Sequence, residues 1–518
     1  LESMCAAIRD CAIMEEFIGI KKYFIYPCTD ISVIKYRKSI MRELDEKPEL
    51  FNFCESYYDF IKRICKSQIA VENASNKLKI RVLHYEMLAD FIFGMKDLYD
   101  KLQNISVSSQ GLTLMADTIK TFVTSQEFKE IYHGIEKLNT IKEKVQNFKL
   151  VFNNAGGSNI VSVAIKDNAA AHGDQAKEQP GKGITHESIT HEMSSLMDFL
   201  PVGFDWDVNV YQDIEYSTFE GIIIDKLQQI HPEFFHELEA FHAKYENYDM
   251  KVFIQMAEDM MFYISFIRFM KKLKKKGFKF TNPDICEELN KTEVHGAYDL
   301  TLAVKLAKEG RDYRGITCND YLFDDENRFF ILTGPNQGGK TTFLRSIGII
   351  QVLAQAGCPV PAEFARISLT DHIFTHFTTA ETVKDKNGRF ADEMKRLGEI
   401  LHKATSKSMI LLNETFAGTR RDAAVEIACR IIFSILNKGC HGGYVTHFYE
   451  MYERLEGTSG VFSLLAEAVG KKDGSGIRTY KIIRAAPEGT GYALDIARKC
   501  GVTFEQLMEL VSSGMNQV

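Results

Sequence analysis

A glycine-rich run at residues 334–342, GPNQGGKTT, constrains the fold of this chain most strongly. It fits the phosphate-loop pattern G-x-x-x-x-G-K-[ST]. The apolar run at 329–332 before it predicts a buried strand, and residues 343–353 after it have the pattern of a helix. Glycines in such a loop let backbone N–H groups close around phosphate oxygens at the helix N-terminus, where the helix dipole favours anions. The order of strand, loop and helix therefore predicts a phosphate-binding site.

This loop supplies the first candidate site residues. Lys340 is expected to reach the β and γ phosphates of a nucleotide, and the Thr341 hydroxyl is expected to hold Mg²⁺. The remaining candidate nucleotide-binding residues of the run are Gly334, Pro335, Asn336, Gln337, Gly338, Gly339 and Thr342. The pattern predicts ATP or ADP, with Mg²⁺, as the cofactors.

A second signal is the apolar run at 409–412 with two polar residues directly after it. Such a strand delivers Asn413 and Glu414 to the carboxyl edge of a sheet, where α/β proteins bind ligands. Glu414 is a candidate catalytic carboxylate that orients or activates the attacking water. Asn413 is a candidate metal residue in a position that usually holds an Asp. Because an amide brings no charge, we expect weaker Mg²⁺ affinity or slower turnover.

A third predicted strand, at 443–446, leads into His447. A histidine at this edge is a candidate sensor of the γ-phosphate, and it is the second candidate catalytic residue. A single histidine after a strand is more often structural. Its place after the acidic strand favours the functional interpretation.

Composition limits the class of protein. A chain of 518 residues is too long for one core, so two or three domains are expected. The net charge of −7 argues against a surface that is basic overall, so nucleic acid would bind through a local patch. The 11 cysteines include no C-x-x-C pair and predict reduced thiols in a cytoplasmic protein. We expect neither a membrane span nor a signal peptide.

The pattern along the chain changes near residue 293. Residues 1–292 are expected to be mainly helical, with a hairpin at 148–165 and a flexible loop at about 167–183. Residues 293–518 alternate strands with helices, as in a mostly parallel α/β sheet. The predicted strands are 329–333, 366–369, 373–378, 409–413 and 443–446, with a final hairpin of 461–468 against 478–483. Helices are expected at 493–501 and 504–513.

These motifs carry a resemblance to a known family. GPNQGGKTT, GRFADEM at 388–394, ILLNETFAGT at 410–419 and VTH at 445–447 occur in the order and spacing of the MutS family ATPase domain. The match covers roughly residues 293–502. The helical block before it resembles the MutS core, or lever, domain, with a vestigial clamp reaching to about residue 235. The resemblance implies an ABC-type ATPase that acts as a homodimer, with double-stranded DNA held between its arms.

The resemblance also assigns roles and exposes departures. Residues 387–389 fall in the signature loop that reaches the partner's γ-phosphate, yet Arg389 and Phe390 stand where the family has Ser-Thr or Ser-Ser. Ile316 falls where many members stack an aromatic ring on adenine, so it is a candidate nucleotide contact. The C-terminal helices would form the dimerisation segment. We expect no counterpart of the family's mismatch-reading, connector or nuclease domains, although Leu1 in place of Met leaves upstream domains open.

Two hypotheses of function remain. In the first, a homodimeric ATPase clamps mismatched or branched DNA. In the second, a nucleotide-gated ATPase binds protein partners and has no direct DNA role, as the acidic net charge and Asn413 suggest. The basic run at 271–279 is more typical of the solvated end of a helix than of a DNA contact. A transporter ATPase is the third alternative, but the L-S-G-G-Q type signature is missing from the sequence.

Overall fold

The structure is a computed structural model. It describes residues 22–146, 148–153, 162–167, 227–289, 291–377, 389–416, 420–470, 476–487 and 503–508. The chain forms two compact units, one of residues 1–48, 109–111 and 261–518 and one of residues 49–108 and 112–260. The predicted functional division of the sequence between residues 292 and 293 stays a prediction.

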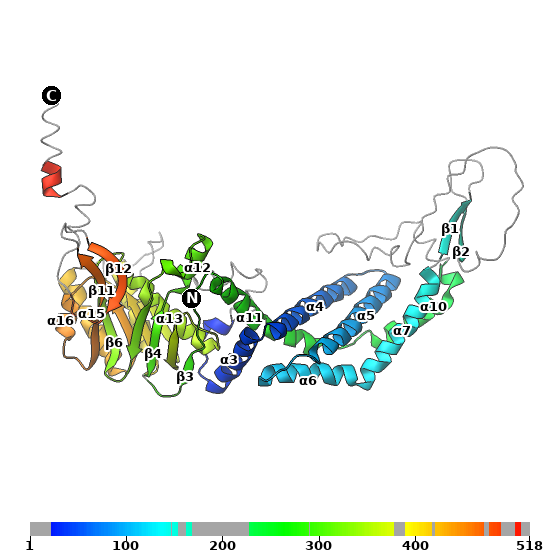
Figure 1. The fold of residues 1–518 in the computed structure, drawn as a ribbon, viewed down its shortest axis with the longest axis horizontal. Coiled ribbons are helices and arrows are strands. Elements are labelled where there is room, and N and C mark those ends of the chain that lie inside the picture. Colours follow the sequence, from blue (N-terminus) through cyan, green and yellow to red (C-terminus); the bar gives the residue numbers. More distant parts are fainter. Residues whose placement is uncertain are drawn as a thin grey trace, which may run out of the picture. The chain divides into compact units, whose positions relative to one another are not determined.

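The unit of residues 49–108 and 112–260 is mainly helical (Figure 1). Its helices are α4 (Pro48–Glu72), α5 (Lys77–Leu102), α6 (Gln110–Thr124), α7 (Gln126–Gln146), α10 (Pro232–Tyr245) and the first part of α11 (Lys251–Lys274). Helix α10 packs against both α5 and α7. The helical pattern expected over much of residues 1–292 is thus confirmed for the described part.

Aromatic side chains form the core of this helical unit. The ring of Phe253 on α11 lies 5.4 Å from that of Phe91 on α5 and 4.8 Å from that of Phe122 on α6, between ring centroids. The Tyr57 hydroxyl on α4 donates a 2.9 Å hydrogen bond to the Phe253 carbonyl oxygen. Buried aromatic residues contribute large apolar areas, so these contacts tie helices that are distant in sequence into one core.

A short hairpin follows α7. Strands β1 (Phe148–Asn153) and β2 (Ser162–Asp167) pair antiparallel, with Phe148 opposite Asp167, which confirms the hairpin expected from the alternating pattern. The turn between the strands lies outside the described residues. So do residues 168–226, which carry the expected flexible loop and most of the expected vestigial clamp.

The other unit carries two sheets. Its elements are α3 (Ile31–Glu46), the end of α11, β3 (Asp284–Cys286), β4 (Thr292–Ala297), α12 (Leu300–Lys308), a 3-10 turn (Tyr313–Gly315), β5 (Asn319–Phe323), β6 (Asn327–Thr333), α13 (Lys340–Ala356), β7 (Phe364–Ser368), β8 (Ile373–Phe377), α14 (Arg389–Lys403), β9 (Met409–Asn413), α15 (Arg421–Asn437), β10 (His441–Val445), α16 (Glu450–Leu455), β11 (Gly460–Gly470) and β12 (Gly476–Ile483).

The larger sheet places the candidate site. In the described residues its strand order is β12-β11-β6-β10-β9-β8, and all neighbours are parallel except the β11–β12 hairpin. This confirms the expected mostly parallel sheet and the final hairpin. Because β6, β9 and β10 are adjacent and parallel, the chain segments that follow them emerge at one edge.

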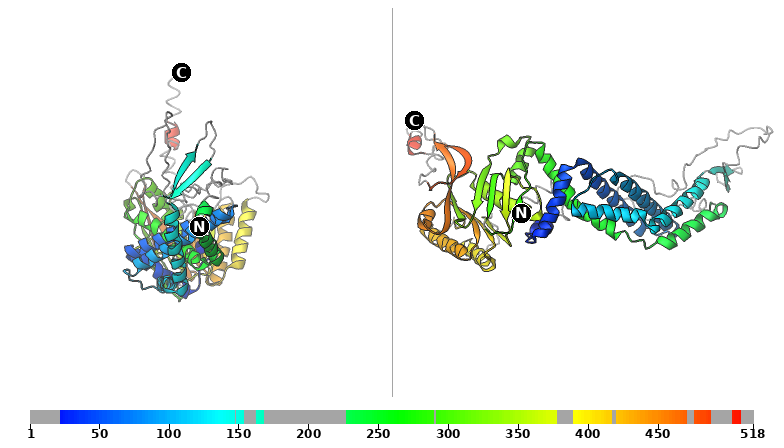
Figure 2. Two further views of the ribbon diagram at one scale, coloured as in Figure 1. Left: turned by 90° about the vertical axis from the view of Figure 1, so that its right-hand side faces the viewer. Right: turned by 60° about the horizontal axis from the view of Figure 1, so that its bottom comes forward.

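Helices cover both faces of this sheet (Figure 1 and Figure 2). Helix α13 packs on β9 and β10 on one face. On the other face, Ile410 and Leu412 of β9 share a buried cluster with residues of α15 such as Ile432. Successive strand residues point to opposite faces, so a strand covered on both sides needs a continuous apolar run. That is why residues 409–412 are all hydrophobic.

The second sheet differs from the sequence prediction. Strand β7, predicted as 366–369 within the large parallel sheet, belongs instead to a four-stranded sheet of order β3-β7-β4-β5, where it pairs antiparallel with β4. The other three strands of this sheet have no counterpart among the predicted strands. These strands are three to six residues long and only partly buried, so their hydrophobic pattern is weak.

Two further expectations concern cysteines and membranes. Eight cysteines lie in the described residues, and all eight are free thiols. None of the helices in the described part of the chain combines the length and the apolar character that a membrane crossing requires. Of the two helices expected at the C-terminus, residues 493–501 lie outside the described residues, and 504–508 are helical.

Candidate nucleotide site

The glycine-rich loop joins β6 to α13, as expected. Helix α13 begins at Lys340, earlier than the Phe343 predicted from the apolar pattern, because Gly339 before it adopts φ +87° and turns the chain into the helix. Gly334 has φ +120°, and a Cβ there would lie 2.8 Å from the Ala466 carbonyl oxygen on β11. Both positions therefore require glycine. Gln337 between them also has a positive φ, of 61°.

Lys340 is held inside the loop. Its ammonium donates hydrogen bonds to the carbonyl oxygens of Gly334 (2.9 Å) and Pro335 (2.8 Å), and only 5% of the residue is exposed. Burial lowers the pKa of Lys340, whereas the negative charge of Glu414 opposes that change. A buried cation is costly unless anions or dipoles compensate it, so phosphate oxygens are suited to replace the two carbonyls as its partners.

The two candidate metal residues are in direct contact. The Thr341 hydroxyl, in the first turn of α13, donates a 2.9 Å hydrogen bond to the Asn413 side-chain oxygen at the end of β9. Asn413 is buried, with 6% exposed. The two residues are 72 positions apart in sequence. The parallel register of the sheet brings them together, with Asn413 opposite Val445 on β10.

Glu414 begins a tight turn after β9. Its backbone N–H donates a 2.8 Å hydrogen bond to the Val445 carbonyl oxygen. Glu414 and Phe416 both have left-handed backbones, with φ of 48° and 68°. Such conformations cost about 1–3 kcal/mol for residues other than glycine and persist only where the surroundings impose them. Glu414 contributes to the lining of the same pocket as Lys340.

His447 lies beyond the end of β10. Its ring packs against Phe448, with centroids 4.0 Å apart, and its side chain is exposed. Nearby protein atoms displace part of its hydration and lower the pKa of His447, while the charge of Glu414 acts in the opposite direction and that of Lys340 adds to the lowering. His447 is therefore close enough to both site charges to respond to them, although it does not line the pocket.

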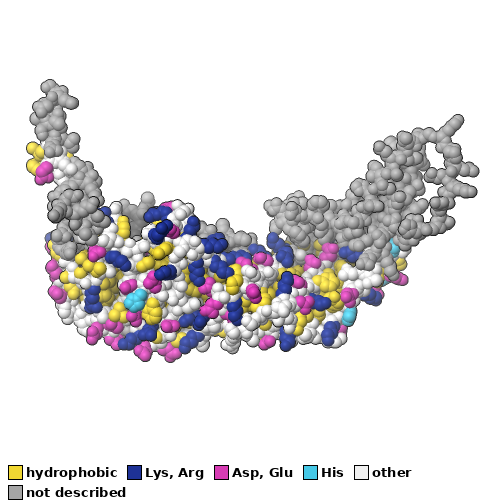
Figure 3. Space-filling view, viewed as in Figure 1, with side chains coloured by type: hydrophobic (Ala, Val, Ile, Leu, Met, Phe, Trp, Pro, Cys, Tyr) yellow, Lys and Arg dark blue, Asp and Glu magenta, His cyan; other side chains and the backbone are white. Residues whose placement is uncertain are grey.

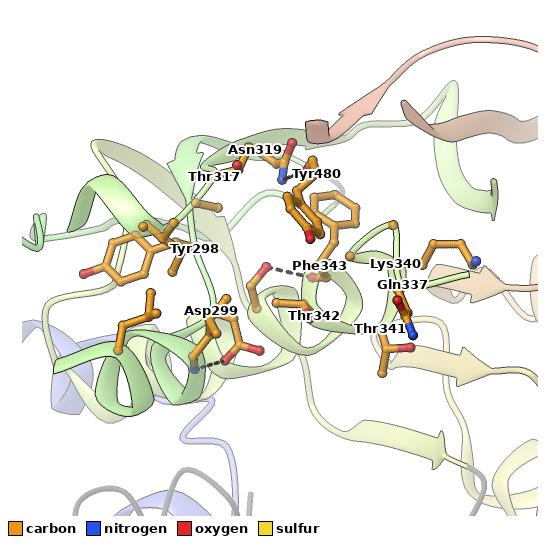
Figure 4. Close-up of a pocket in the computed structure, with 18 of the residues that line it drawn as sticks. Tyr298, Asp299, Thr317, Asn319, Gln337, Lys340, Thr341, Thr342, Phe343 and Tyr480 are labelled. Carbon is orange, nitrogen blue, oxygen red and sulfur yellow. Dashed lines mark hydrogen bonds between the residues drawn. The ribbon is translucent and has the colours of Figure 1, made fainter. Parts of the chain in front are cut away.

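A cavity of about 650 Å³ extends from the loop (Figure 4). Gln337, Lys340 and Thr341 lie at one end, and Tyr298 and Asp299 lie at the other. The volume is within the range of small-molecule sites, about 300–1,000 Å³. Asp299 caps the N-terminus of α12 and pairs with Arg345 of α13, which fixes the wall at that end.

The cavity wall beside the loop is joined to β12, since a Cβ on Gly339 would lie 3.5 Å from a ring atom of Tyr480. The Asn319 side chain accepts a 2.8 Å hydrogen bond from Ile482 N and donates one of 3.1 Å to the Tyr480 carbonyl oxygen. Tyr480 has φ +61° and is half exposed. Ile316 also lines the cavity, as an aliphatic contact rather than a ring. Tyr480 therefore supplies an aromatic ring to the cavity that contains Ile316.

The pocket gathers most, but not all, of the candidate residues. Its lining includes Ile316, Asn336, Gln337, Gly338, Gly339, Lys340, Thr341, Thr342 and Glu414. Gly334, Pro335 and Asn413 adjoin it through their hydrogen bonds to Lys340 and Thr341. Further lining residues have no predicted site role, because they lie outside the nucleotide motifs: Tyr298, Asp299, Arg311, Thr317 and Tyr480. Residues 387 and 388 of the expected signature loop lie outside the described residues, and so does the end of the ILLNETFAGT motif, at 417–419.

The known proteins to which this chain is similar carry the family name that the motifs indicate. The family model described as MutS domain V matches residues 330–513. The DNA mismatch repair protein MutS of Fervidobacterium nodosum is 34% identical over 199 residues, which are 38% of this chain and 24% of the relative. The protein of the same name from Clostridium kluyveri is 24% identical over 519 residues, or 94% of this chain and 56% of the relative. That from Chlorobium limicola is 38% identical over 189 residues.

A mostly parallel sheet with a glycine-rich phosphate-loop motif between a central strand and a helix defines an α/β protein of the phosphate-loop class. With the similarities above, the assignment becomes narrower. Residues 330–513 resemble domain V of the MutS family, and the chain is similar to curated MutS proteins. It spans about half the length of the C. kluyveri relative and about a quarter of that from F. nodosum.

Proposed function

We propose that this chain binds and hydrolyses ATP, and that as a homodimer it uses the nucleotide to clamp mismatched or branched double-stranded DNA. The observation that carries the proposal is the convergence of Lys340, Thr341, Asn413 and Glu414 from two separate sequence motifs onto one edge of the sheet. The names of the relatives, DNA mismatch repair proteins, support DNA as the partner.

The chemistry follows from the positions of these side chains. Lys340 would exchange its two carbonyl partners for oxygens of the β and γ phosphates. Glu414 would orient a water molecule for attack on the γ-phosphorus, giving ADP and phosphate. His447 would respond to the γ-phosphate, since its pKa already depends on both Glu414 and Lys340. The ring of Tyr480 and the side chain of Ile316 would contact the base.

The residues present fit a weakly held Mg²⁺. The Thr341 hydroxyl and the Asn413 side-chain oxygen are neutral oxygen donors within hydrogen-bond distance of each other. Mg²⁺ usually keeps several waters and takes the rest of its ligands from a few protein oxygens and the substrate phosphates. When bound, the ion would neutralise charge on the phosphates. Because neither protein donor is anionic, we propose low Mg²⁺ affinity and slow turnover.

Replacing Asn413 with aspartate is expected to raise the affinity for Mg²⁺. The carboxylate keeps the acceptor for the Thr341 hydroxyl and adds a negative charge, a change worth roughly tenfold, or about 1.4 kcal/mol. A Mg²⁺ titration of ATP binding measures the effect. Asn437→Asp, at the exposed end of α15, is the matched control. A Mg²⁺ dependence unchanged by Asn413→Asp would show that Asn413 does not face the ion.

The DNA-binding part of the proposal needs basic side chains that are available to phosphates. On the face drawn in Figure 3, Lys and Arg are interspersed with Asp and Glu over the described residues. In the basic run at 271–279, Lys274 pairs with Asp45 and Lys279 pairs with Glu363, each at 2.7 Å. Helix α11 ends at Lys274, so lysines there also complement the helix dipole. This supports the interpretation of the run as a solvated helix end.

The second candidate function is a nucleotide-gated ATPase that binds protein partners and not DNA. The pairing of Lys274 and Lys279 with carboxylates favours it, together with the net charge of −7. Nonspecific DNA affinity depends on phosphate contacts by free cations and is strongly sensitive to salt. Stable, salt-sensitive binding to duplex or junction DNA would exclude this alternative.

Steady-state ATP hydrolysis with and without DNA separates the two functions. The clamp predicts that turnover changes severalfold with mismatched or branched duplex, because DNA held between arms would bias their nucleotide-dependent motion. The Glu414→Gln variant is the control for contaminating ATPases. Turnover that is indifferent to every DNA, yet lost in Glu414→Gln, would favour the protein-binding alternative.

A further inference from the structure

The Glu414 turn is held from outside by side chains of three other elements. The Tyr444 hydroxyl on β10 donates a 2.7 Å hydrogen bond to the Thr415 carbonyl oxygen. His376 Nδ1 on β8 lies 3.2 Å from the Thr415 hydroxyl. The Phe416 backbone N–H donates a 3.0 Å hydrogen bond to Glu393 Oε2 on α14. Of the two left-handed residues in the turn, Phe416 is held directly by one of these contacts, and Glu414 is next to Thr415, which is held by the other two.

Glu393 is the charged member of this set, and it is buried. Only 8% of Glu393 is exposed, and its neighbours Phe416 and His376 are also buried, with 1% and 4% exposed. Burying a carboxylate is unfavourable unless hydrogen bonds compensate it. A neutral acceptor such as an amide would satisfy the same N–H at a lower desolvation cost. A carboxylate that accepts the N–H of a strained residue in the catalytic turn thus suggests a function beyond packing.

Helix α14 contacts the turn through one face. Phe390, Glu393 and Leu397 follow the i, i+3, i+7 spacing of a single helix face. The Phe390 ring lies 5.7 Å from that of Phe416, and Leu397 is buried in the cluster that contains Phe416. A shift of α14 along its axis would therefore move the hydrogen bond and the ring contact together, and with them the backbone that directs Glu414.

We propose that Glu393 is a positioning residue for Glu414: it accepts the Phe416 N–H, fixes the left-handed turn at 414–416 and so aims the Glu414 carboxylate into the nucleotide pocket. This role rests on the proposed ATP hydrolysis. Through this bond, the position of α14 determines the position of the Glu414 carboxylate. Glu393 itself would not contact the nucleotide, since it does not line the pocket.

The test compares Glu393→Ala, Glu393→Gln and the matched control Glu399→Ala, which removes an exposed carboxylate from the same helix. Glu393→Ala should lower kcat about a hundredfold, the size of effect expected from a misplaced catalytic group, and leave the ATP dissociation constant unchanged. Glu393→Gln keeps an acceptor oxygen and should recover most of kcat. Hydrogen exchange at the Phe416 amide should accelerate in the alanine variant and stay slow in the glutamine and control variants.

A double variant separates positioning from general destabilisation. In the Glu414→Gln background, Glu393→Ala should add no further loss of turnover, because the group that it positions is already removed. If the wild-type protein hydrolyses no more ATP than Glu414→Gln, the proposed function fails and this role fails with it. If the wild type is active and Glu393→Ala retains its kcat, or if Glu393→Gln loses as much kcat as alanine, the positioning role alone is overturned.

Discussion

Replacing Lys340 with alanine is expected to abolish nucleotide binding at micromolar ATP. Lys340 is the cationic residue of the glycine-rich run, and it lines the pocket. Hydrogen bonds to the carbonyl oxygens of Gly334 and Pro335 fix the position of its ammonium. Hydrogen bonds to charged groups contribute up to about 3 kcal/mol, which corresponds to roughly a hundredfold weaker binding. Isothermal titration with ATP and Mg²⁺, together with steady-state turnover, measures both consequences.

The control for this variant is Lys407→Ala, which removes an exposed lysine of the same unit, away from the pocket. Melting temperatures of both variants without nucleotide check that the fold is kept. ATP should raise the melting temperature of the wild type and the control but not that of Lys340→Ala, because a ligand stabilises only the protein that binds it. Unchanged ATP affinity and turnover in Lys340→Ala would mean that the loop does not bind phosphate.

The sequence predicted the large sheet well because its central strands β6, β9 and β10 are buried on both faces. Residues 409–412 form an unbroken apolar run, and the strand predicted at 409–413 has the same bounds as β9. The small sheet was missed because β4 and β5 mix buried and exposed residues over only five or six positions. Strand β7 was located, but its partner was not, since a local pattern does not specify which sheet a strand joins.

The loop end of the candidate site was predictable because its residues lie in contiguous motifs. The contact between Thr341 and Asn413 follows from two such motifs and the parallel order of β6, β10 and β9. The lining residues outside these motifs were not predictable. Tyr480 enters the pocket only because the β11–β12 hairpin folds next to the loop and Asn319 holds its backbone. Glu393 is similar: it lies in the segment GRFADEM at 388–394, but nothing in that segment specifies its bond to Phe416, 23 residues further along the chain.

Replacing Glu414 with glutamine should reduce ATP hydrolysis by about 10²–10³-fold while ATP binding is retained. The amide has the same size and the same strained backbone position, with φ +48°, but it does not accept a proton from the attacking water. General base catalysis contributes about 10²–10⁴-fold, which sets the expected loss. Single-turnover hydrolysis measures the chemical step, and titration with ATP measures binding.

The matched control is Glu399→Gln, an exposed glutamate on α14, which should hydrolyse ATP as the wild type does. Because Glu414→Gln binds ATP without consuming it, the variant should also accumulate as an ATP-bound dimer, detectable by light scattering after gel filtration. A Glu414→Gln protein that stays monomeric with saturating ATP would contradict the dimeric clamp. Full hydrolysis by the variant would instead show that another group activates the water, and His447, whose pKa responds to Glu414 and Lys340, would be the next residue to replace.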